Sequence, residues 1–482
     1  MNWESLINEN TLSWLLPDEY AHYRKPLQDA LTLFLEGLSA KRVEIIAREQ
    51  EMLPTTATVF DRLIQLARSC PVLHKLGQTL ARDRHLSAEL RRYLQRLESF
   101  PPSIDSGTVE GLLTRELGPL HRLGVTLLPP ALAEASVAIV VPFYYSDGKA
   151  PSNGVFKLLK PGIEERLEED LNMLDRVGSF LDRMCDDLQI PHLDYRESFE
   201  LVREKLRYEV RLDKEQRNLS LAREFHKRDP RVRIPVLFDF CTPRITAMER
   251  ITGQKVTESF PDWNEKIRMA RLVIEALIAR PIFSRDPQAL FHGDPHAGNL
   301  FSTKDRRLAI LDWSLTGLLT EQERIAIVQI MLGAVSFRTE SIVAVLSGLS
   351  ERHSVDLTVL RSIVYKWTRR IREGLLPGLT WLTGLLDEAV QNGGLRFGAN
   401  LMLFRKALLM VEGVVTDIGG GSTLIDQVLL SEFAIHFSAE WPWRFLTLPD
   451  SHAFATRISN IDLAELMLSF PWMSVEFWLD RV

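Results

Sequence analysis

The most constraining feature of the sequence is a short polar loop that carries two carboxylates and one amide in a fixed order. Residues 291–301 read FHGDPHAGNLF, and an apolar run then ends at Asp312. Asn299 follows Asp294 by five residues, and a polar turn at residues 302–307 separates it from Asp312. Phosphoryl transfer uses this order: one aspartate orients the nucleophile, while an asparagine and a second aspartate supply oxygen ligands for magnesium. The stretch therefore predicts a phosphoryl-transfer centre.

The spacing inside this loop is typical of the kinase-like superfamily. The interval from Asp294 to Asn299 equals that of the protein-kinase catalytic loop, and Asp312-Trp-Ser stands where a protein kinase has Asp-Phe-Gly. Small-molecule phosphotransferases also use His-Gly-Asp loops and Asp-Trp motifs. An enzyme of the aminoglycoside or choline kinase type therefore stays open as an alternative.

Two further interpretations of the loop are open. His292, Asp294 and His296 alternate like metal ligands on a strand, which leaves a hydrolytic metal site open. Pro295 and Gly298 favour a loop instead, either an ordinary turn without chemistry or a catalytic loop. In a catalytic loop, the two histidines are expected to brace the chain through hydrogen bonds.

Bulk properties limit the class of protein. With 482 residues the chain exceeds one typical core, so two or three packed units are expected. A net charge of -6, with both signs interspersed, argues against a nucleic-acid partner. Cys70, Cys185 and Cys241 lie far apart, as in reduced cytoplasmic proteins. Neither a signal peptide nor a transmembrane run is visible, so we expect a cytoplasmic protein, at most peripheral to the inner membrane.

Hydrophobic patterning divides the chain into three predicted regions. Residues 1–126 form a helical extension, residues 127–250 a small lobe with strands, and residues 251–482 a helical lobe with a helical tail. The expected fold class is α+β, a protein-kinase-like fold of two lobes with extra N-terminal helices and a largely helical C-lobe. Helix is expected throughout most of residues 6–98.

A predicted hairpin in the small lobe carries a lysine. Residues 139–145 and 154–159 read as strands joined by a turn at residues 146–149, and Lys157 lies inside the second strand. With a loop of small residues before the first strand, this arrangement resembles the hairpin that covers the nucleotide in kinases. Lys157 would then hold the α and β phosphates of ATP. Taken alone, a lysine in a strand more often faces solvent.

The acidic partners of lysines are expected on a helix further along the chain. An acidic helix is predicted at residues 163–187, and one long helix at residues 201–227 carries Glu209 and Glu215. Six residues on one helix correspond to about 120° of separation, so these two carboxylates need different partners. Pairs of Glu215 with Lys157 and of Glu209 with Lys75 satisfy this geometry, while exposed salt bridges remain the alternative.

Two more strands are predicted at residues 232–240 and 244–249, before the passage to the helical lobe. Here the backbone of Met248 and Glu249 is positioned like a kinase hinge that bonds adenine, unless Met248 is simply a core residue. A helix is predicted at residues 262–279.

After Thr320 the pattern is helical to the end, and helix breaks are expected at Pro377, Gly393, Gly419 and Pro442. The tail is rich in aromatic residues, at residues 441–445 and 470–478. Aromatic side chains of this kind anchor at bilayer surfaces, although packing onto the helical lobe explains them equally well.

Four upstream motifs, in order, precede the loop at residues 291–299 and carry a resemblance to a known family. They are HKLGQ at residues 74–78, AEASVA at residues 133–138, FKLLKPGI at residues 156–163 and EVRLDKEQRN at residues 209–218. Together they resemble the UbiB/AarF family of atypical protein-kinase-like proteins, a group linked to ubiquinone biosynthesis.

The resemblance implies ATP and Mg²⁺ as cofactors and assigns a role to each site residue. The nucleotide-binding residues would be Ala135, Ser136, Val137, Ala138, Lys157, Met248 and Glu249. The catalytic residues would be Lys157, Glu215 and Asp294, and the metal ligands Asn299 and Asp312. Lys75, Gln78 and Glu209 would be regulatory, since the family's extra element is thought to occlude the peptide-substrate site.

We hypothesise ATP bound between the lobes, with Asp294 aligning water or a small acceptor for attack on the γ-phosphoryl group. The resemblance implies an atypical kinase or ATPase that supports ubiquinone or isoprenoid-lipid metabolism, with quinone precursors or lipid at a membrane surface as partners. Self-association stays open, and so does a nucleotide-binding pseudokinase that acts as a scaffold.

Several positions depart from the family pattern. The family's Glu-x-Asp pair reads Glu209-Val-Arg211, so a cation replaces one acid. Ile139 stands where a glutamine is typical, which implies the loss of a polar group near the nucleotide. Ala297 replaces a common proline, and Asp312-Trp-Ser replaces Asp-Phe-Gly. The phosphate and metal ligands themselves are all present.

Overall fold

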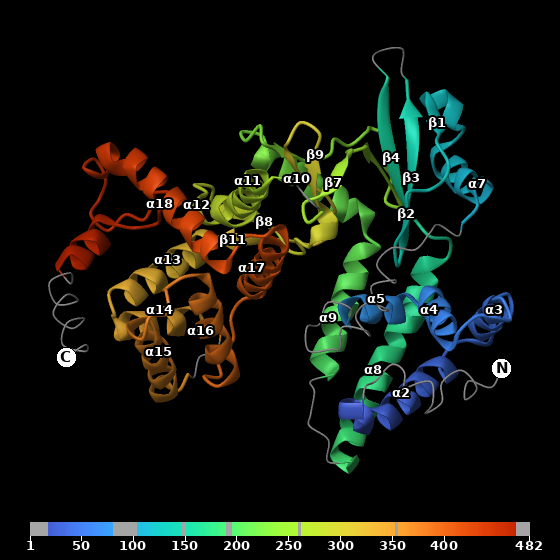
Figure 1. Cartoon of the computed structure of the whole chain (residues 1–482), viewed down its shortest axis with the longest axis horizontal. Coiled ribbons are helices and arrows are strands. Elements are labelled where there is room, and N and C mark those ends of the chain that lie inside the picture. Colours follow the sequence, from blue (N-terminus) through green and yellow to red (C-terminus); the bar gives the residue numbers. More distant parts are fainter. Residues whose placement is uncertain are drawn as a thin grey trace. The chain divides into compact units, whose positions relative to one another are not determined.

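A computed structural model describes residues 18–80, 104–146, 151–188, 195–258, 262–351 and 355–468. The chain divides into two compact units (Figure 1). Unit 1 comprises Met1–Arg217 and Val236–Arg250, and unit 2 comprises Asn218–Pro235 and Ile251–Val482. Helices with small sheets make up both units, which confirms the predicted α+β class.

Unit 1 is built on an antiparallel sheet that contains the predicted hairpin. Its strands are β1 (Val125–Leu127), β2 (Ala133–Glu134), β3 (Ala138–Tyr145), β4 (Ser152–Leu159) and β6 (Ile245–Glu249). They follow the order β1-β3-β4-β6, and β2 pairs with β3. The hairpin prediction is thus confirmed as β3 and β4, while residues 147–150 of its turn lie outside the described residues.

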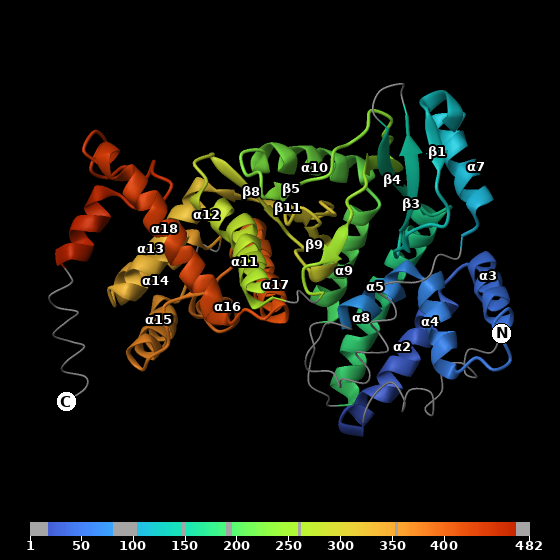
Figure 2. The ribbon, with the colours of Figure 1, turned by 45° about the horizontal axis from the view of Figure 1, so that its top comes forward.

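The two faces of this sheet differ because side chains alternate along each strand. Lys157 pairs with Val140 on β3 and with Thr246 on β6, so these three share one face. Ile139 and Phe156 lie on the reverse face, in an apolar core with α7 (Ser106–Leu117), which lies beside β1 in Figure 2. The prediction that Ile139 removes a polar group near the nucleotide is therefore wrong, since its side chain is fully buried on the face opposite Lys157.

The N-terminal helices pack on two later helices and form a second core of unit 1. The predicted helical region is confirmed over α2 (Arg24–Glu36), α3 (Ala40–Glu51), α4 (Val59–Ser69) and α5 (Pro71–Leu80). The predicted acidic helix is α8 (Ile163–Leu188), and α9 (Tyr195–Glu209) follows it.

A buried ion pair ties these helices together. The Arg42 guanidinium donates to Asp170 Oδ1 at 3.1 Å and to the Ser69 carbonyl oxygen at 3.1 Å. Burial raises the pKa of Asp170 to about 7, against the opposing effect of Arg42.

The single helix predicted over residues 201–227 is wrong, because two helices occupy it. Helix α9 ends at Glu209, and α10 (Leu212–His226) begins after Arg211, whose carbonyl oxygen accepts from the Lys214 and Glu215 N–H groups. Leu206 and Leu212 are both fully buried in the core of the N-terminal helices. Six residues apart on one continuous helix, they would point about 120° away from each other, so the break lets both enter the same core.

The strand predicted over residues 232–240 is also wrong, because its two ends belong to different units. β5 (Val232–Arg233) pairs in parallel with β10 (Leu308–Ile310) in unit 2. Past Pro235, the chain enters unit 1, where Leu237 forms a bridge with Met248. Proline has no N–H group with which to continue a strand ladder, so Pro235 fits the point where the strand ends and the chain passes into unit 1.

Unit 2 contains two small sheets and a large set of helices. One sheet has the order β5-β10-β9-β7, with β9 (Leu300–Thr303) and β7 (Gly253–Lys255), and β8 (Gln288–His292) pairs with β11 (Thr316–Thr320). The predicted helix at residues 262–279 is confirmed as α11 (Trp263–Ile274), the π-helix η4 (Glu275–Ala279) and α12 (Arg280–Phe283).

The predicted helical character after Thr320 is confirmed through six labelled helices and a helical segment at residues 460–468. The labelled helices are α13 (Glu321–Val335), α14 (Thr339–Leu349), α15 (Leu357–Arg372), α16 (Leu379–Gln391), α17 (Ala399–Ile418) and α18 (Ser422–Arg444). The break expected at Pro442 is wrong, since α18 continues for two more residues. A proline in the last turn removes only one hydrogen bond close to the helix end. Residues 445–459 form turns instead of helix.

Across the described ranges, no helix combines the length and apolar character needed to cross a bilayer.

Candidate functional site

A buried ion pair on the Lys157 face of the sheet is the centre of the site in unit 1. Lys157 Nζ lies 2.8 Å from both carboxylate oxygens of Glu215, and the two side chains are 12% and 4% exposed. Glu215 lies in the first turn of α10, where the helix dipole favours a negative charge. The predicted pairing of Lys157 with Glu215 is confirmed.

The neighbouring residue holds α10 against the sheet. Gln216 Nε2 donates to the carbonyl oxygens of Thr242 and Ile245 at 2.8 and 3.1 Å, and lies 3.0 Å from Thr246 Oγ1. Because Thr246 shares a face with Lys157, these bonds keep the helix that carries Glu215 in register with the strand that carries the lysine.

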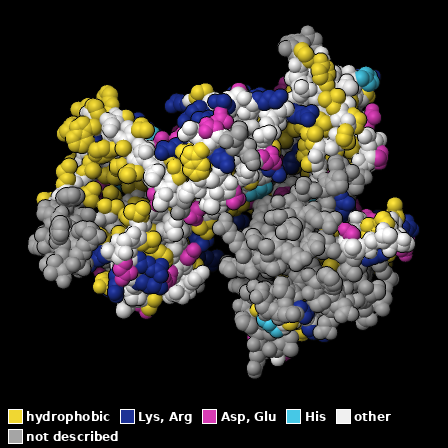
Figure 3. Space-filling view, in the orientation of Figure 1, with side chains coloured by type: hydrophobic (Ala, Val, Ile, Leu, Met, Phe, Trp, Pro, Cys, Tyr) yellow, Lys and Arg dark blue, Asp and Glu magenta, His cyan; other side chains and the backbone are white. Residues whose placement is uncertain are grey.

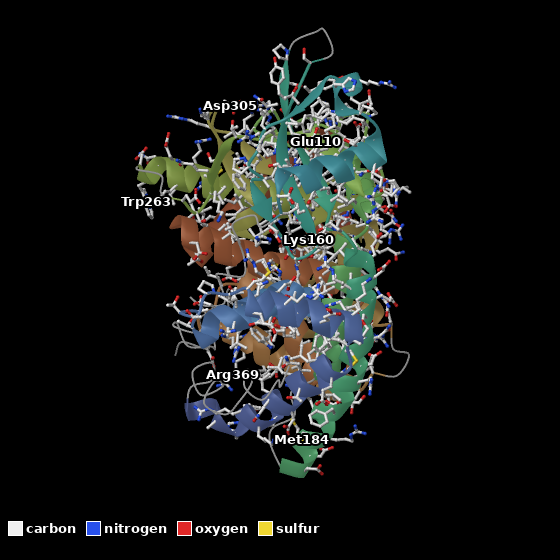
Figure 4. All side chains as sticks on the ribbon, turned by 90° about the vertical axis from the view of Figure 1, so that its right-hand side faces the viewer. Glu110, Lys160, Met184, Trp263, Asp305 and Arg369 are labelled. Atoms are coloured by element: carbon white, nitrogen blue, oxygen red, sulfur yellow. The ribbon has the colours of Figure 1, made fainter. Side chains whose placement is uncertain are left out.

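The predicted nucleotide loop forms a tight backbone turn before β3. The Ala135 N–H donates to the Ala138 carbonyl oxygen at 2.8 Å, and the Lys160 N–H donates to the Val137 carbonyl oxygen at 2.9 Å. Glu134 Oε1 lies 2.8 Å from Lys160 Nζ, in a pair whose side chains are almost fully buried. Burial lowers the pKa of Lys160, and Glu134 partly offsets this effect. Lys160 is labelled in Figure 4.

One carboxylate joins this loop to the N-terminal helices. Ser136 Oγ donates to Glu209 Oε2 at 3.0 Å, and Lys75 Nζ forms an ion pair with Glu209 Oε1. The predicted pairing of Glu209 with Lys75 is therefore confirmed. Gln78 Nε2 lies 3.2 Å from His74 Nε2, one turn away on α5.

Arg211, the cation that replaces an acid of the family pattern, forms its ion pair with Asp213. Arg211 Nε lies 2.9 Å from Asp213 Oδ1, and the arginine side chain is half exposed. This contact lowers the pKa of Asp213 and leaves Lys75 paired with Glu209.

The predicted hinge residues end strand β6. Met248 is in register with Val155 on β4 and bridges Leu237 on its other side. The Glu249 N–H donates to the Val236 carbonyl oxygen at 2.7 Å, and the Arg250 N–H donates to the Asn153 carbonyl oxygen at 3.0 Å. These N–H groups are already used within unit 1, so a backbone contact of Glu249 with adenine would use its carbonyl oxygen.

In unit 2, two histidines brace the loop around Asp294, as predicted. His292 Nδ1 accepts from the Asp294 N–H at 3.1 Å, and its Nε2 lies 3.1 Å from the Leu311 carbonyl oxygen. His296 Nδ1 accepts from the Gly298 N–H at 3.1 Å. Burial lowers the pKa of His292, and a neutral ring protonated on Nε2 satisfies both of its contacts.

The predicted metal ligands lie at one end of the β9–β10 ladder. Asn299 Nδ2 donates to the Asp294 carbonyl oxygen at 3.1 Å. The Leu311 N–H donates to the Asn299 carbonyl oxygen at 2.8 Å, which places Asp312 close to Asn299 in the fold. Asp312 has φ 51°, a left-handed conformation that aspartate tolerates better than most residues, and its Oδ1 accepts from the Ser314 N–H.

The donor set is chemically suited to a hard cation. Asp294 and Asp312 offer carboxylate oxygens and Asn299 an amide oxygen, the ligands that Mg²⁺ prefers. Among the residues that the structure describes, no cluster of three or more His, Cys, Asp or Glu side chains is arranged as a metal site. A hydrolytic site built on His292, Asp294 and His296 is therefore not supported, because the Nδ1 atoms of both histidines already accept backbone N–H groups.

Two positioning residues near Asp312 were not predicted. Trp313 is 1% exposed, and its indole N–H donates to the Ile310 carbonyl oxygen at 3.2 Å while its ring packs at 4.8 Å from His292. Asn218 Nδ2 donates to the Trp313 carbonyl oxygen at 3.0 Å. The position of Asn218, three residues after Glu215, was the one hint in the sequence. Its partner, the Trp313 carbonyl oxygen, lies 95 residues away along the chain.

The family profile of the ABC1 atypical kinase-like domain matches residues 97–346. The chloroplastic protein ACTIVITY OF BC1 COMPLEX KINASE 1 of Arabidopsis thaliana is 25% identical over 77% of this chain and 54% of its own length. The "Probable protein kinase UbiB" of Marinobacter nauticus is 26% identical over 55% of this chain and 49% of its own length.

The alignments with these two relatives thus span about half of each relative's length. A solved structure of Rv3197 with erythromycin, from Mycobacterium tuberculosis, matches with a TM-score of 0.49 and 17% identity, over 74% of this chain and 90% of that one.

Proposed function

The chain belongs to the family of ABC1 atypical kinase-like proteins, and from that premise we propose that it is a magnesium-dependent enzyme that transfers or hydrolyses the γ-phosphoryl group of ATP. The observation that carries the proposal is the buried pair of Lys157 and Glu215 at 2.8 Å. Kinase-like folds use a lysine held by a helix glutamate to bind the α and β phosphates.

Unit 1 would supply the contacts to the nucleotide. Lys157 would neutralise phosphate charge while Glu215 keeps its ammonium group in place. The turn of Ala135, Ser136, Val137 and Ala138 would cover the phosphates. Met248 and Glu249 would contact adenine, Met248 through its side chain and Glu249 through its carbonyl oxygen.

Unit 2 would supply the metal ligands and the residue that orients the nucleophile. Asn299 and Asp312 would hold Mg²⁺, which supplies charge neutralisation at the phosphates when bound. Asp294 would accept a hydrogen bond from water or a small acceptor and so align it for attack. His292 contributes by holding the Asp294 N–H, because a fixed backbone limits the positions that the carboxylate can take.

Lys75, Gln78 and Glu209 would regulate this chemistry. Glu209 contacts both Lys75 of the N-terminal helices and Ser136 of the nucleotide loop. A change in the N-terminal helices would therefore reach the loop through a single carboxylate.

The relatives named UbiB support a role in ubiquinone or isoprenoid-lipid metabolism, with a lipid surface or quinone precursors as partners. One surface of unit 2 fits such a setting. Hydrophobic side chains gather over α18 in Figure 3. Those that are 63–77% exposed near its end are Trp443, Phe445, Leu446 and Leu448. Exposed aromatic and leucine side chains partition into the interface of a bilayer.

Vesicle co-sedimentation tests this surface. The variant Trp443→Ser/Phe445→Ser should lower the bound fraction several-fold, since each ring contributes to partitioning. Leu221→Ser, at an isolated exposed leucine of α10, is the matched control. Equal binding of all three proteins would remove α18 from the membrane proposal. Residues 470–478 of the aromatic tail lie outside the described residues.

The enzymatic proposal is tested by ATP consumption with and without Mg²⁺, lipid vesicles and quinone precursors. Asp312→Asn should lower magnesium-dependent hydrolysis by about 100-fold or more, because it removes a charged metal ligand. Asp305→Asn is the matched control, since Asp305 lies in the exposed β9–β10 turn and contacts Thr303 and Arg307.

Unchanged hydrolysis in Asp312→Asn would sink the mechanism. If the wild-type protein binds ATP in a magnesium-dependent way without consuming it, the pseudokinase alternative replaces the enzyme. Transfer to a small alcohol or amine in place of hydrolysis would favour the aminoglycoside or choline kinase type.

A further inference from the structure

A cavity of about 560 Å³ lies in unit 1 on the reverse face of the sheet, away from Lys157. Val141 of β3 lines it, whereas its neighbour Val140 is in register with Lys157 on the opposite face. Helix α7, the short helix η3 (Leu120–Leu123) and strand β1 form the other sides. The cavity is therefore separate from every residue assigned above to ATP or metal.

The floor of the cavity is apolar. Val109, Leu120, Val125 and Val141 line it, and each is between 2% and 7% exposed. A volume of this size falls in the range of small-molecule sites, roughly 300–1,000 Å³, and such sites are mostly apolar inside. An apolar body of a ligand would thus be favoured over water at the floor.

The wall of the cavity is held by backbone hydrogen bonds, so the site is preformed. The Leu128 N–H donates to the Pro142 carbonyl oxygen at 2.9 Å, and the Leu132 N–H donates to the Val140 carbonyl oxygen at 2.7 Å. These bonds fasten the segment between them, which contributes Pro129 and Ala131 to the lining. A preformed site spares a ligand the cost of ordering its own walls.

Polar groups are confined to the rim. The exposed lining residues that can form side-chain hydrogen bonds are Ser106, Glu110, Thr114, His121 and Thr126. Glu110, labelled in Figure 4, is the one carboxylate among the lining residues, and its oxygens can only accept hydrogen bonds when ionised.

We propose that this cavity binds a small neutral molecule with an apolar body and one hydroxyl head. The body lies on the apolar floor, and the head donates a hydrogen bond to Glu110. The apolar floor is complementary to an apolar body, and Glu110 at the rim is complementary to a group that donates a hydrogen bond. Binding to this cavity is independent of the proposed function, since it can be measured with ATP and Mg²⁺ absent.

The test uses the full chain and a small apolar diazirine photolabel, with labelled peptides located by mass spectrometry. Labelling of residues 104–131 should saturate. It should be suppressed by 1-naphthol at about tenfold lower concentration than by naphthalene, because the naphthol hydroxyl adds a hydrogen bond to a carboxylate. Glu110→Leu should abolish this difference between the two competitors.

Two tryptophan variants of helix α7 distinguish labelling inside the cavity from nonspecific labelling of the protein surface. Thr114→Trp places an indole at the rim and should weaken labelling at residues 104–131 about tenfold, a modest loss of affinity. Arg115→Trp adds the same ring at the next residue, outside the lining, and should leave labelling unchanged. Both positions are exposed, so the fold should tolerate them. Thr126→Trp places the same ring at the rim from strand β1 and should weaken the labelling in the same way as Thr114→Trp.

Labelling that does not saturate, or that is equal in the Thr114, Thr126 and Arg115 variants, would overturn the proposal. So would labelling confined to the exposed apolar residues of α18. A loss of ATP hydrolysis in Asp312→Asn has no bearing on these results, which keeps the two proposals distinguishable.

Discussion

The Lys157–Glu215 pair of unit 1 and the Asp294 loop of unit 2 are positioned in opposite ways. The ion pair joins residues 58 positions apart, and both partners are charged groups removed from water. The loop is held by His292 and Asn299 through bonds that span 2 and 5 residues, and these contacts are neutral. The first arrangement exists only once a strand and a helix have packed together, whereas the second is almost complete within one short segment.

The difference predicts different sensitivities. A buried ion pair offsets a large desolvation cost, so removing one partner leaves an uncompensated charge. A loop held by imidazole and amide groups loses one hydrogen bond at a time, and it depends on the histidine remaining neutral. Three substitutions test this contrast.

The largest effect is expected from Glu215→Gln. It removes the carboxylate whose two oxygens both contact the buried Lys157 ammonium, and the free energy of unfolding of unit 1 should fall by about 3–5 kcal/mol. Urea denaturation measures this loss, and adding Lys157→Met to the same chain should restore part of it. Glu340→Gln is the control, because its exposed pair with Arg361 should contribute no measurable stability. Equal behaviour of the two glutamate variants would erase the distinction between a buried and an exposed pair.

The second effect is a pH dependence of unit 2. Burial lowers the pKa of His226, next to Trp313, to about 3. Its unfolded pKa is about 6.5, so the stabilisation is present above pH 6.5 and is lost as the pH falls from there toward about 3, by about 1.4 kcal/mol per pH unit. His226→Gln should have a shallower loss of thermal midpoint between pH 6.5 and pH 5, and exposed His121→Gln should follow the wild type. Parallel curves for all three proteins would contradict the buried neutral histidine.

The smallest effect is expected from Ser136→Ala. It removes one hydrogen bond to Glu209, which keeps its ion pair with Lys75, so the stability loss should be about 1 kcal/mol. Hydrogen exchange should accelerate at the backbone of residues 133–138, because the turn loses a side-chain anchor. Ser362→Ala, which removes a local bond on α15, is the control. Unchanged protection at residues 133–138 would show that the backbone turn alone holds the loop.

The bracing of the Asp294 loop was predictable because the residues that hold it lie within the loop itself. The spacing from Asp294 to Asn299 predicts a phosphoryl-transfer centre, and this role stays a prediction. The partners of Lys157 and Lys75 could be predicted because the geometry of a helix excluded a shared carboxylate. Both predicted pairs form although α9 and α10 are two separate helices and not the single helix predicted over residues 201–227.

Other features could not be predicted because they depend on strand register and on which distant segments pack together. The fact that Ile139 faces away from Lys157 follows from a strand register that only the paired sheet defines. Asn218 and Trp313 are 95 residues apart in the sequence, and no local pattern predicts the hydrogen bond between them. The cavity behind the sheet needs α7 and β3 in place before it has any volume.

The types of chemical groups, their order and the local turns follow from the sequence alone, because hydrogen bonds within a few residues and side-chain periodicity act without the rest of the chain. Tertiary packing sets where helices break, which face of a strand is buried and which long-range partner a charge receives. Burial and desolvation set these outcomes, and both depend on surfaces that come together only when distant segments pack.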